Sequence, residues 1–205
     1  MILKVHLDNP QPRAIQKAAE VLSAGGAVIY PTDTVYGIGA SVEDKNAIEK
    51  IHTLKRQRHD RPFSFVCSDL THISEYAHVS NSAFKIMKRL IPGAYTFILP
   101  AARMKQLPKI LVSKRKTVGI RVPDSPVTLA IIKELGHPIL STSVTDDDGN
   151  ILNDPADIAR IFRNSVELII DGGVGTTTAS TILDLTGEEP VVLRHGAGDV
   201  SWLEG

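Results

Sequence analysis

Hydroxyl and arginine side chains, with one carboxylate, recur in, or just after, the apolar runs that predict strands. They are Thr32, Asp33 and Thr34 after the run 27–30, Arg121 within 118–122, Ser141, Thr142 and Ser143 at the end of 138–142, and Arg194 at the end of 190–194. Arginine donates parallel hydrogen bonds to a carboxylate or phosphate, and hydroxyls donate to the remaining oxygens. These residue types predict one pocket for an anionic ligand, a nucleotide or a small acid, beyond the carboxyl ends of the strands.

Other kinds of site find less support in the sequence. Neither phosphate-binding motif, G-x-x-x-x-G-K-[ST] or G-x-G-x-x-G, occurs, so side chains must hold any phosphate. The histidines show no metal-ligand spacing and no serine has an obvious histidine and acid partner, so we expect neither a protein-bound metal nor a serine hydrolase. Each polar residue also has a plainer interpretation, because strand-end hydroxyls often satisfy backbone groups and Arg121 suits a salt-bridged strand position.

The charge pattern is balanced overall and clustered locally. The 205 residues include 23 basic and 23 acidic side chains, so net charge gives no general case for nucleic-acid binding. Basic residues cluster at 55–61 and 114–116, and three aspartates follow one another at 146–148. Short clusters of this kind are usually solvated surface.

Hydrophobic periodicity predicts the elements that must position these side chains. Helices are expected over 12–22, 44–56, 82–90, 125–135 and 155–163, and strands over 2–7, 27–30, 63–67, 95–99, 118–122, 138–142, 167–171, 180–185 and 190–194. Ser125 and Pro126 suit a helix start, and Gly136 suits its end. The alternation predicts an α/β fold in one domain over 1–205, with a mixed, largely parallel sheet flanked by helices and a flexible surface loop at 144–154.

The sequence gives no sign of export or membrane insertion. Its one cysteine, Cys67, cannot form an internal disulfide, no N-terminal signal pattern is present, and no apolar run approaches the ~20 residues of a membrane span. We therefore expect a cytoplasmic protein, and a monomer. Cys67 ends the apolar run 63–67, which predicts a buried structural thiol.

Several segments, in their order and spacing, resemble the threonylcarbamoyl-AMP synthase (YrdC-like) family. They are 30–37 (YPTDTVYG), Lys55 on a basic loop ending at Pro62, 92–99 (PGAYTFIL), 117–123 (TVGIRVP), 138–143 (PILSTS), 180–184 (STILD) and 193–196 (LRHG). Any one segment is a weak match. Their shared order is specific, and it covers nearly the whole chain.

The resemblance implies a twisted open sheet that encloses a deep, positively lined cavity. It also implies an enzyme that joins L-threonine, bicarbonate and ATP into threonylcarbamoyl-AMP, releases pyrophosphate and so feeds the threonylcarbamoyladenosine modification of tRNA. Such a reaction needs positioning and charge neutralisation more than a protein nucleophile. This expectation agrees with the absence of a recognisable catalytic dyad.

The resemblance further implies a role for each matching residue. The threonine-binding residues would be Thr34, Arg121, Ser141 and Ser180; the nucleotide-binding residues Lys55, Arg58, Arg61, Thr117, Ser143 and Arg194; and the catalytic residues Lys55 and Arg58. Arg121 would bind the substrate carboxylate. The basic residues would neutralise the triphosphate and stabilise the pentavalent state of adenylyl transfer. Mg²⁺ would bridge the phosphates, held mainly by the nucleotide.

Two departures bring the chain nearest to the YciO branch of this family. Gln57 stands where the family's Lys-x-Arg pattern has arginine, and Thr145 stands where its Ser-x-Asn pattern has asparagine. Both lie on the nucleotide half of the implied site.

Two alternatives to a threonylcarbamoyl-AMP synthase stay open. One alternative is a non-catalytic protein that binds tRNA or double-stranded RNA, or acts in ribosome maturation, through its basic clusters. Another is a related enzyme that uses a different small acid.

Overall fold

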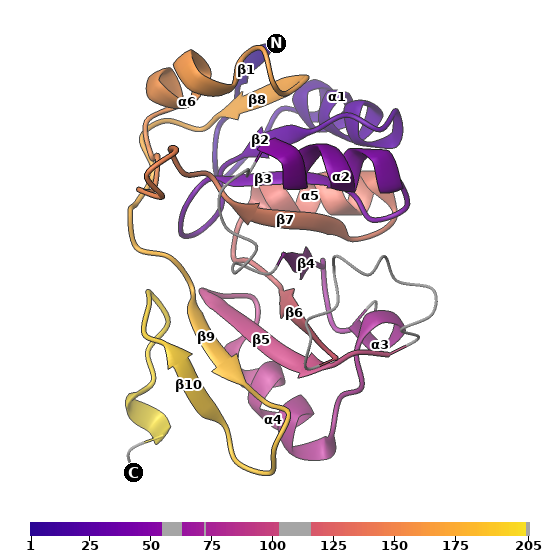
Figure 1. Ribbon diagram of the computed structural model, residues 1–205, viewed down its shortest axis with the longest axis vertical. Helices are drawn as coiled ribbons and strands as arrows, with labels where there is room; N and C mark the ends of the chain where they lie inside the picture. The colour runs from indigo at the N-terminus through magenta and orange to yellow at the C-terminus, as the bar shows by residue number, and fades with distance from the viewer. Residues whose placement is uncertain (55–62, 72, 103–115, 204–205) are drawn as a thin grey trace.

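The computed structural model describes residues 1–54, 63–71, 73–102 and 116–203 (Figure 1). The strands in these residues are β1 (Ile2–Lys4), β2 (Val28–Tyr30), β3 (Gly37–Ser41), β4 (Ser64–Val66), β5 (Tyr95–Pro100), β6 (Thr117–Arg121), β7 (Ile139–Ser143), β8 (Leu168–Asp171), β9 (Thr181–Asp184) and β10 (Val191–Arg194). They form one open sheet in the order β1-β8-β2-β3-β7-β4-β6-β5-β9-β10. The prediction of a mixed sheet is confirmed.

The directions of the strands correct one part of the sequence prediction. Five neighbouring pairs are antiparallel and four are parallel, so the expected largely parallel sheet is wrong. Two of the antiparallel pairs involve β3, which sequence periodicity missed because Gly37, Gly39, Ala40 and Ser41 have little strand propensity. This strand returns from β2 as a hairpin and runs antiparallel to both of its neighbours, β2 and β7. The carboxyl ends of the strands therefore do not share one edge.

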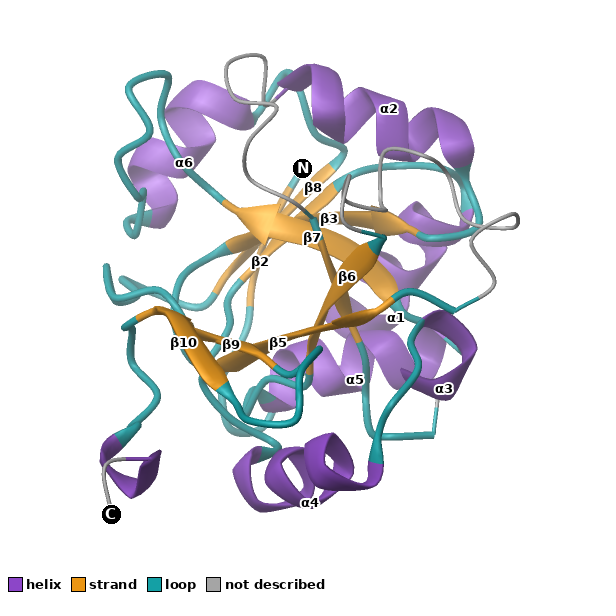
Figure 2. Ribbon diagram, turned by 60° about the horizontal axis from the view of Figure 1, so that its bottom comes forward, coloured by secondary structure: helices purple, strands orange, loops and turns teal. Residues whose placement is uncertain are grey.

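Helices cover both faces of the sheet (Figure 2). They are α1 (Pro12–Ser23), α2 (Lys45–Leu54), α3 (Ile73–Tyr76), α4 (Asn81–Leu90), α5 (Pro126–Leu135) and α6 (Pro155–Phe162), with a 3₁₀ turn, η2, at Ser201–Leu203. The five predicted helices are confirmed, although the last two predicted residues of α2 lie outside the described residues. The short α3 and η2 were not predicted. None of the helices in the described ranges has the length and apolar character needed to cross a bilayer.

Two hydrophobic cores lie on opposite faces of the sheet. Val28 and Tyr30 of β2 belong to a core with α1 and α5, whereas Ile29 between them belongs to the core with α2 and α6. Ile139 and Leu140 of β7 divide in the same way. Successive side chains of a strand point to opposite faces of the sheet, so this alternation shows that both faces of β2 and β7 are buried. The second core continues beneath β5 and β6, where α3 and α4 cover the sheet.

Two local predictions are confirmed by side-chain environment. Ser125 caps α5 by accepting a hydrogen bond from the Thr128 backbone at 3.3 Å, and Gly136 ends this helix in the left-handed conformation with φ of 83°. Cys67 is fully buried, and this burial raises the pKa of its thiol. The thiol therefore stays protonated and belongs to the core.

Candidate functional site

Strand register places several predicted site residues on one face of the sheet. Ser141 of β7 lies opposite Ser64 of β4, and Ser64 lies opposite Gly119 of β6. Directly opposed residues point to the same face, and so do residues two positions apart on one strand. We call this surface the polar face and define it by Gly37, Gly39, Ser64, Thr117, Gly119, Arg121, Ser141 and Ser143. Thr117, Arg121, Ser141 and Ser143 thus share one face of the sheet, whereas Thr34 lies on the loop after β2 and Ser180 directly precedes β9.

Tyr30 determines how Ser141 presents its hydroxyl. Its ring lies over Gly37 and Gly39, where a Cβ atom would come within 3.0–3.1 Å of the ring. The Tyr30 hydroxyl donates to Ser141 Oγ at 2.7 Å, and Ser141 Oγ donates to the Ile38 carbonyl at 3.2 Å. Burial raises the pKa of Tyr30 to about 12, so the phenol remains a donor near neutral pH. Ser141 therefore has only an acceptor lone pair left for a ligand.

The loop between β2 and β3 carries Thr34 and is held by hydroxyl contacts. Thr32 Oγ1 donates to the Val35 carbonyl at 2.7 Å and accepts from the Thr34 backbone at 3.1 Å. The two threonine hydroxyl oxygens are 3.3 Å apart. Because the proton of Thr32 is used on Val35, Thr34 is the donor between them. Thr34 is buried, and its carbonyl accepts from Thr176 Oγ1 at 2.7 Å.

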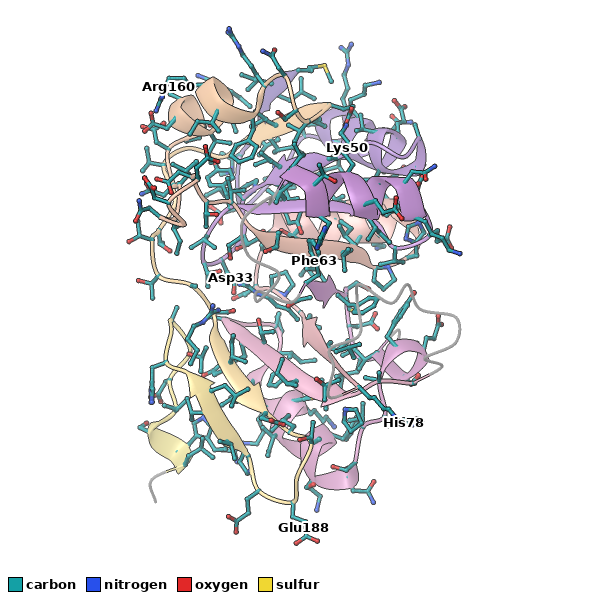
Figure 3. All side chains as sticks on the ribbon, in the orientation of Figure 1. Asp33, Lys50, Phe63, His78, Arg160 and Glu188 are labelled. Carbon is teal, nitrogen blue, oxygen red and sulfur yellow. The ribbon has the colours of Figure 1, made fainter. Side chains whose placement is uncertain are left out.

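An ion pair joins this loop to the far side of the polar face. Arg121 Nη2 donates to Asp33 Oδ1, and each side chain is 11% exposed. Burial lowers the pKa of the Arg121 guanidinium and the Asp33 charge opposes this effect, so the arginine remains a cation. Figure 3 shows Asp33 between the half of the sheet that contains β7 and the half that contains β5. The pair therefore spans the two halves.

Ser180 and Arg194 form a second polar group beside this arginine. Arg194 Nε and Nη2 donate to the Ser180 carbonyl at 3.0 Å and 2.7 Å, and Nη2 also lies 3.3 Å from Ser180 Oγ. Ser180 Oγ is 2.8 Å from Thr96 Oγ1. Because Phe97 lies opposite Ile120, Thr96 is on the same face of the sheet as Arg121.

The structure brings the predicted residues together to different degrees. Asp33 links Thr34 to Arg121, and Thr96 places Ser180 next to the strand of Arg121. Ser141 is two strands from β6, which corresponds to about 10 Å across the sheet. Thr117 and Ser143 stand on the polar face. Lys55, Arg58 and Arg61 lie outside the described residues, as does Gln57, so the expected deep basic cavity stays a prediction.

Several contributors to this site were not assigned roles from sequence. They are Tyr30, Asp33, Ser64, Thr96, Gly119 and Thr176. A usable signal was the alternation of small or polar residues in Thr117, Gly119 and Arg121, which puts all three on one face of a strand. The ion pair gave no such signal, because Asp33 and Arg121 are 88 positions apart.

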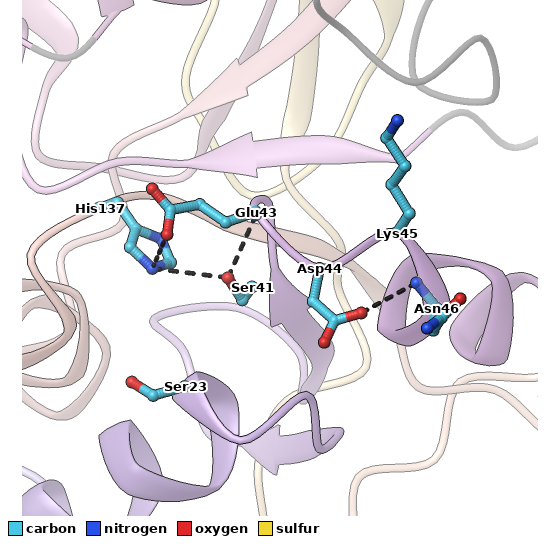
Figure 4. Close-up of a pocket in the computed structure, with 7 residues that line it drawn as sticks. All are labelled: Ser23, Ser41, Glu43, Asp44, Lys45, Asn46 and His137. Carbon is cyan, nitrogen blue, oxygen red and sulfur yellow. Dashed lines mark hydrogen bonds and ion pairs between the residues drawn. The ribbon is translucent and has the colours of Figure 1, made fainter.

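A separate open pocket lies away from the predicted residues (Figure 4). It has a volume of about 550 Å³ and is lined by Ser23, Ser41, Glu43, Asp44, Lys45, Asn46 and His137. His137 Nε2 is 3.6 Å from Glu43 Oε2 and 3.4 Å from Ser41 Oγ. Both contacts use the same ring nitrogen, so they do not form the relay of a catalytic triad.

A family model named Sua5/YciO/YrdC, described as telomere recombination, matches residues 20–196. The chain belongs to this family. YciO of Escherichia coli K12, an uncharacterized protein, is 42% identical over 198 residues, which are 96% of this chain and 95% of YciO. A threonylcarbamoyl-AMP synthase of Bacillus subtilis is 33% identical over 191 residues, which are 92% of this chain and 54% of that synthase.

Solved structures of the family have the same architecture. The crystal structure of E. coli YciO matches with a TM-score of 0.91 and 41% identity, over 98% of this chain and 97% of YciO. The structure of Pyrococcus abyssi Sua5 complexed with L-threonine matches with a TM-score of 0.91 and 29% identity, over 100% of this chain and 60% of Sua5. The YrdC-like fold implied by the sequence resemblance is confirmed.

Proposed function

We propose that this member of the Sua5/YciO/YrdC family is an ATP-dependent nucleotidyltransferase. It would join L-threonine, bicarbonate and ATP into threonylcarbamoyl-AMP with release of pyrophosphate, and the product would serve threonylcarbamoyladenosine modification of tRNA. The observation that carries the proposal is the polar face, where an arginine that is only 11% exposed shares the surface with several hydroxyls and small residues. Relatives named threonylcarbamoyl-AMP synthase and the Sua5 complex with L-threonine support the choice of substrate.

On the amino-acid half, the donors and acceptors match a zwitterion with a hydroxyl. Arg121 would donate to the carboxylate through the terminal N–H groups that are not used on Asp33. Ser141 would accept from an amine or hydroxyl of the substrate, because its own proton is used on Ile38. Thr34 and Ser180 would complete this half. These contacts would fix threonine for the attack of its amine nitrogen on bicarbonate, which releases water and leaves a carbamate.

On the nucleotide half, Thr117, Ser143 and Arg194 would contact ATP. Lys55, Arg58 and Arg61 would neutralise the triphosphate while the carbamate oxygen attacks the α-phosphorus and pyrophosphate departs.

Among the described residues, no group of three or more His, Cys, Asp or Glu side chains could hold a metal ion. We propose that Mg²⁺ enters with ATP as part of the substrate.

The proposal is tested by incubating the protein with L-threonine, bicarbonate and MgATP. The expected products are threonylcarbamoyl-AMP, detected by mass spectrometry, and an equal amount of pyrophosphate. Both must depend on threonine and on bicarbonate. Pyrophosphate release without threonine, or no adenylate at high protein concentration, would show that the chain has another function.

A second candidate is the RNA-binding function that the basic clusters suggest. The observation behind it is the grouping of basic residues at 55–61 and 114–116 in a chain whose net charge is otherwise balanced. Titration of labelled tRNA and duplex RNA at low and high salt tests it, because phosphate contacts make affinity fall steeply with salt. Absence of binding at low salt rejects this candidate.

A third candidate is a related enzyme that uses a different small acid. Thermal-shift screening of amino acids in the presence of ATP tests it, because a ligand that binds the folded protein raises its melting temperature.

A further inference from the structure

Asp33 sits on a loop whose backbone is anchored on both sides of it. The Pro31 carbonyl accepts hydrogen bonds from two hydroxyls at the start of α5, at 3.3 Å and 3.0 Å. The Thr34 carbonyl accepts from Thr176 Oγ1 at 2.7 Å. Because the anchors come from separate parts of the chain, the Asp33 carboxylate stands at a fixed place in front of Arg121.

The ion pair makes one hydrogen bond where two parallel ones are available. Arg121 Nη2 reaches Asp33 Oδ1, but Arg121 Nε and Asp33 Oδ2 are covered and have no hydrogen-bond partner among the described residues. Buried polar atoms nearly always find a partner, and an arginine that only stabilises a carboxylate commonly donates two bonds to it. This incomplete pairing sits on the polar face, so it indicates a guanidinium oriented for a further ligand.

We propose that Asp33 is a positioning residue that holds the Arg121 guanidinium for the α-carboxylate of the amino-acid substrate and so makes the site specific for a free carboxylate. This inference rests on the proposed function. An arginine side chain that spans a sheet face has many rotamers, and fixing them in advance reduces the entropy lost when the ligand binds. One bond to an anchored carboxylate fixes the guanidinium plane and leaves other N–H groups for the ligand.

If Asp33 inhibited binding instead of positioning Arg121, its removal would change the threonine affinity in the opposite direction. If Asp33 acted as an internal carboxylate that blocks Arg121, its removal would release the arginine and tighten substrate binding. If Asp33 positions Arg121, its removal weakens binding and also weakens the preference for a carboxylate. The sign of the change therefore separates the two roles.

The experiment is calorimetric titration of L-threonine and of L-threoninamide into the wild-type protein, Asp33→Asn and Glu167→Gln. The amide analogue keeps the amine and the hydroxyl and removes only the carboxylate charge. Asparagine has nearly the shape of aspartate and leaves no cavity, so Asp33→Asn removes mainly the charge. Glu167 pairs with Lys50 at 2.5 Å in a more exposed place away from the polar face, so its variant controls for the loss of a paired carboxylate charge elsewhere in the molecule. Thermal melts of all three proteins report folding.

We expect wild type and Glu167→Gln to prefer threonine over the amide by about tenfold or more, as for a charge-assisted contact. We expect Asp33→Asn to bind threonine about tenfold more weakly, with the preference reduced to about twofold. A lower melting temperature with the full preference retained would overturn the inference, and so would tighter threonine binding. If wild type binds no threonine, the proposed function fails and this inference fails with it. If wild type binds threonine and Asp33→Asn binds it equally well, the inference alone fails.

Discussion

At the scale of single residues, hydrogen-bond direction decides what the site can recognise. The Ile38 carbonyl can only accept, so Ser141 must donate to it and Tyr30 must donate to Ser141. A ligand oxygen without a proton, such as a carboxylate or phosphate oxygen, finds no donor at Ser141. This chain of hydrogen bonds assigns the anionic end of the substrate to Arg121 and a proton-bearing group to Ser141.

A double-mutant cycle on Tyr30 and Ser141 tests this chain of hydrogen bonds. Tyr30→Phe and Ser141→Ala should each lower the free energy of unfolding by about 1–2 kcal/mol. Because both remove the same hydrogen bond, their effects should overlap by about 1 kcal/mol in the double variant, measured by urea unfolding. Strict additivity would contradict a direct bond between the two hydroxyls.

The raised pKa of Tyr30 predicts a loss of stability in alkali. Burial raises this pKa to about 12, above the value near 10 of an exposed tyrosine. The unfolded chain therefore loses the proton first, so the stabilising contribution is complete below pH 10 and disappears as pH rises from 10 to 12. Urea unfolding at pH 9, 10 and 11 should show wild type losing on the order of 1 kcal/mol per pH unit more than Tyr30→Phe above pH 10. Parallel profiles would reject the assignment.

At the scale of elements, β3 makes room for the site because glycine faces Tyr30. A Cβ atom on Gly39 would stand 2.6 Å from the Ile139 side chain and 3.0 Å from the Tyr30 ring. The same strand pairs with one edge of β7, and the other edge of β7 pairs with β4, which brings Ser141 opposite Ser64. A small-residue strand thus has both a topological and a steric purpose.

Substitution of Gly39 by alanine tests the steric part. Gly39→Ala should lower the free energy of unfolding by about 1–3 kcal/mol, because the methyl group overpacks a core contact. Gly187→Ala is the control, since its Cβ would approach only the Glu189 carbonyl, at 3.7 Å. That variant should stay within about 0.5 kcal/mol of wild type in chemical unfolding. Equal effects of the two would show that Gly39 is not closely packed.

The ion pair between the β2–β3 loop and β6 makes a second prediction at this scale. Arg121→Met leaves the Asp33 charge buried without its partner and should cost about 3–5 kcal/mol of unfolding free energy. Replacing both residues, as Asp33→Asn with Arg121→Met, should recover most of that loss because no lone charge remains. Denaturant titration measures both variants. A double variant as unstable as Arg121→Met would contradict the burial of this charge.

At the scale of the whole molecule, sequence reasoning predicted segments better than their arrangement. Ser125, Pro126 and Gly136 are local signals, and the helix between them is confirmed. The sheet is less parallel than expected for two reasons: β3, whose glycines carry no strand signal, was missed, and three further antiparallel pairs join strands whose relative direction local sequence does not encode. The Asp33–Arg121 pair depends on how the sheet twists, which local periodicity does not encode. Resemblance supplied candidate residues, whereas register showed which of them share a face.

The central claim is that the polar face binds the amino acid through Arg121. Titration of L-threonine into wild type and Arg121→Gln, with MgATP present and absent, tests it most directly. Wild type should release heat that fits one binding site, and Arg121→Gln should bind at least about tenfold more weakly at an unchanged affinity for MgATP. Equal threonine affinity in the two proteins would contradict the claim.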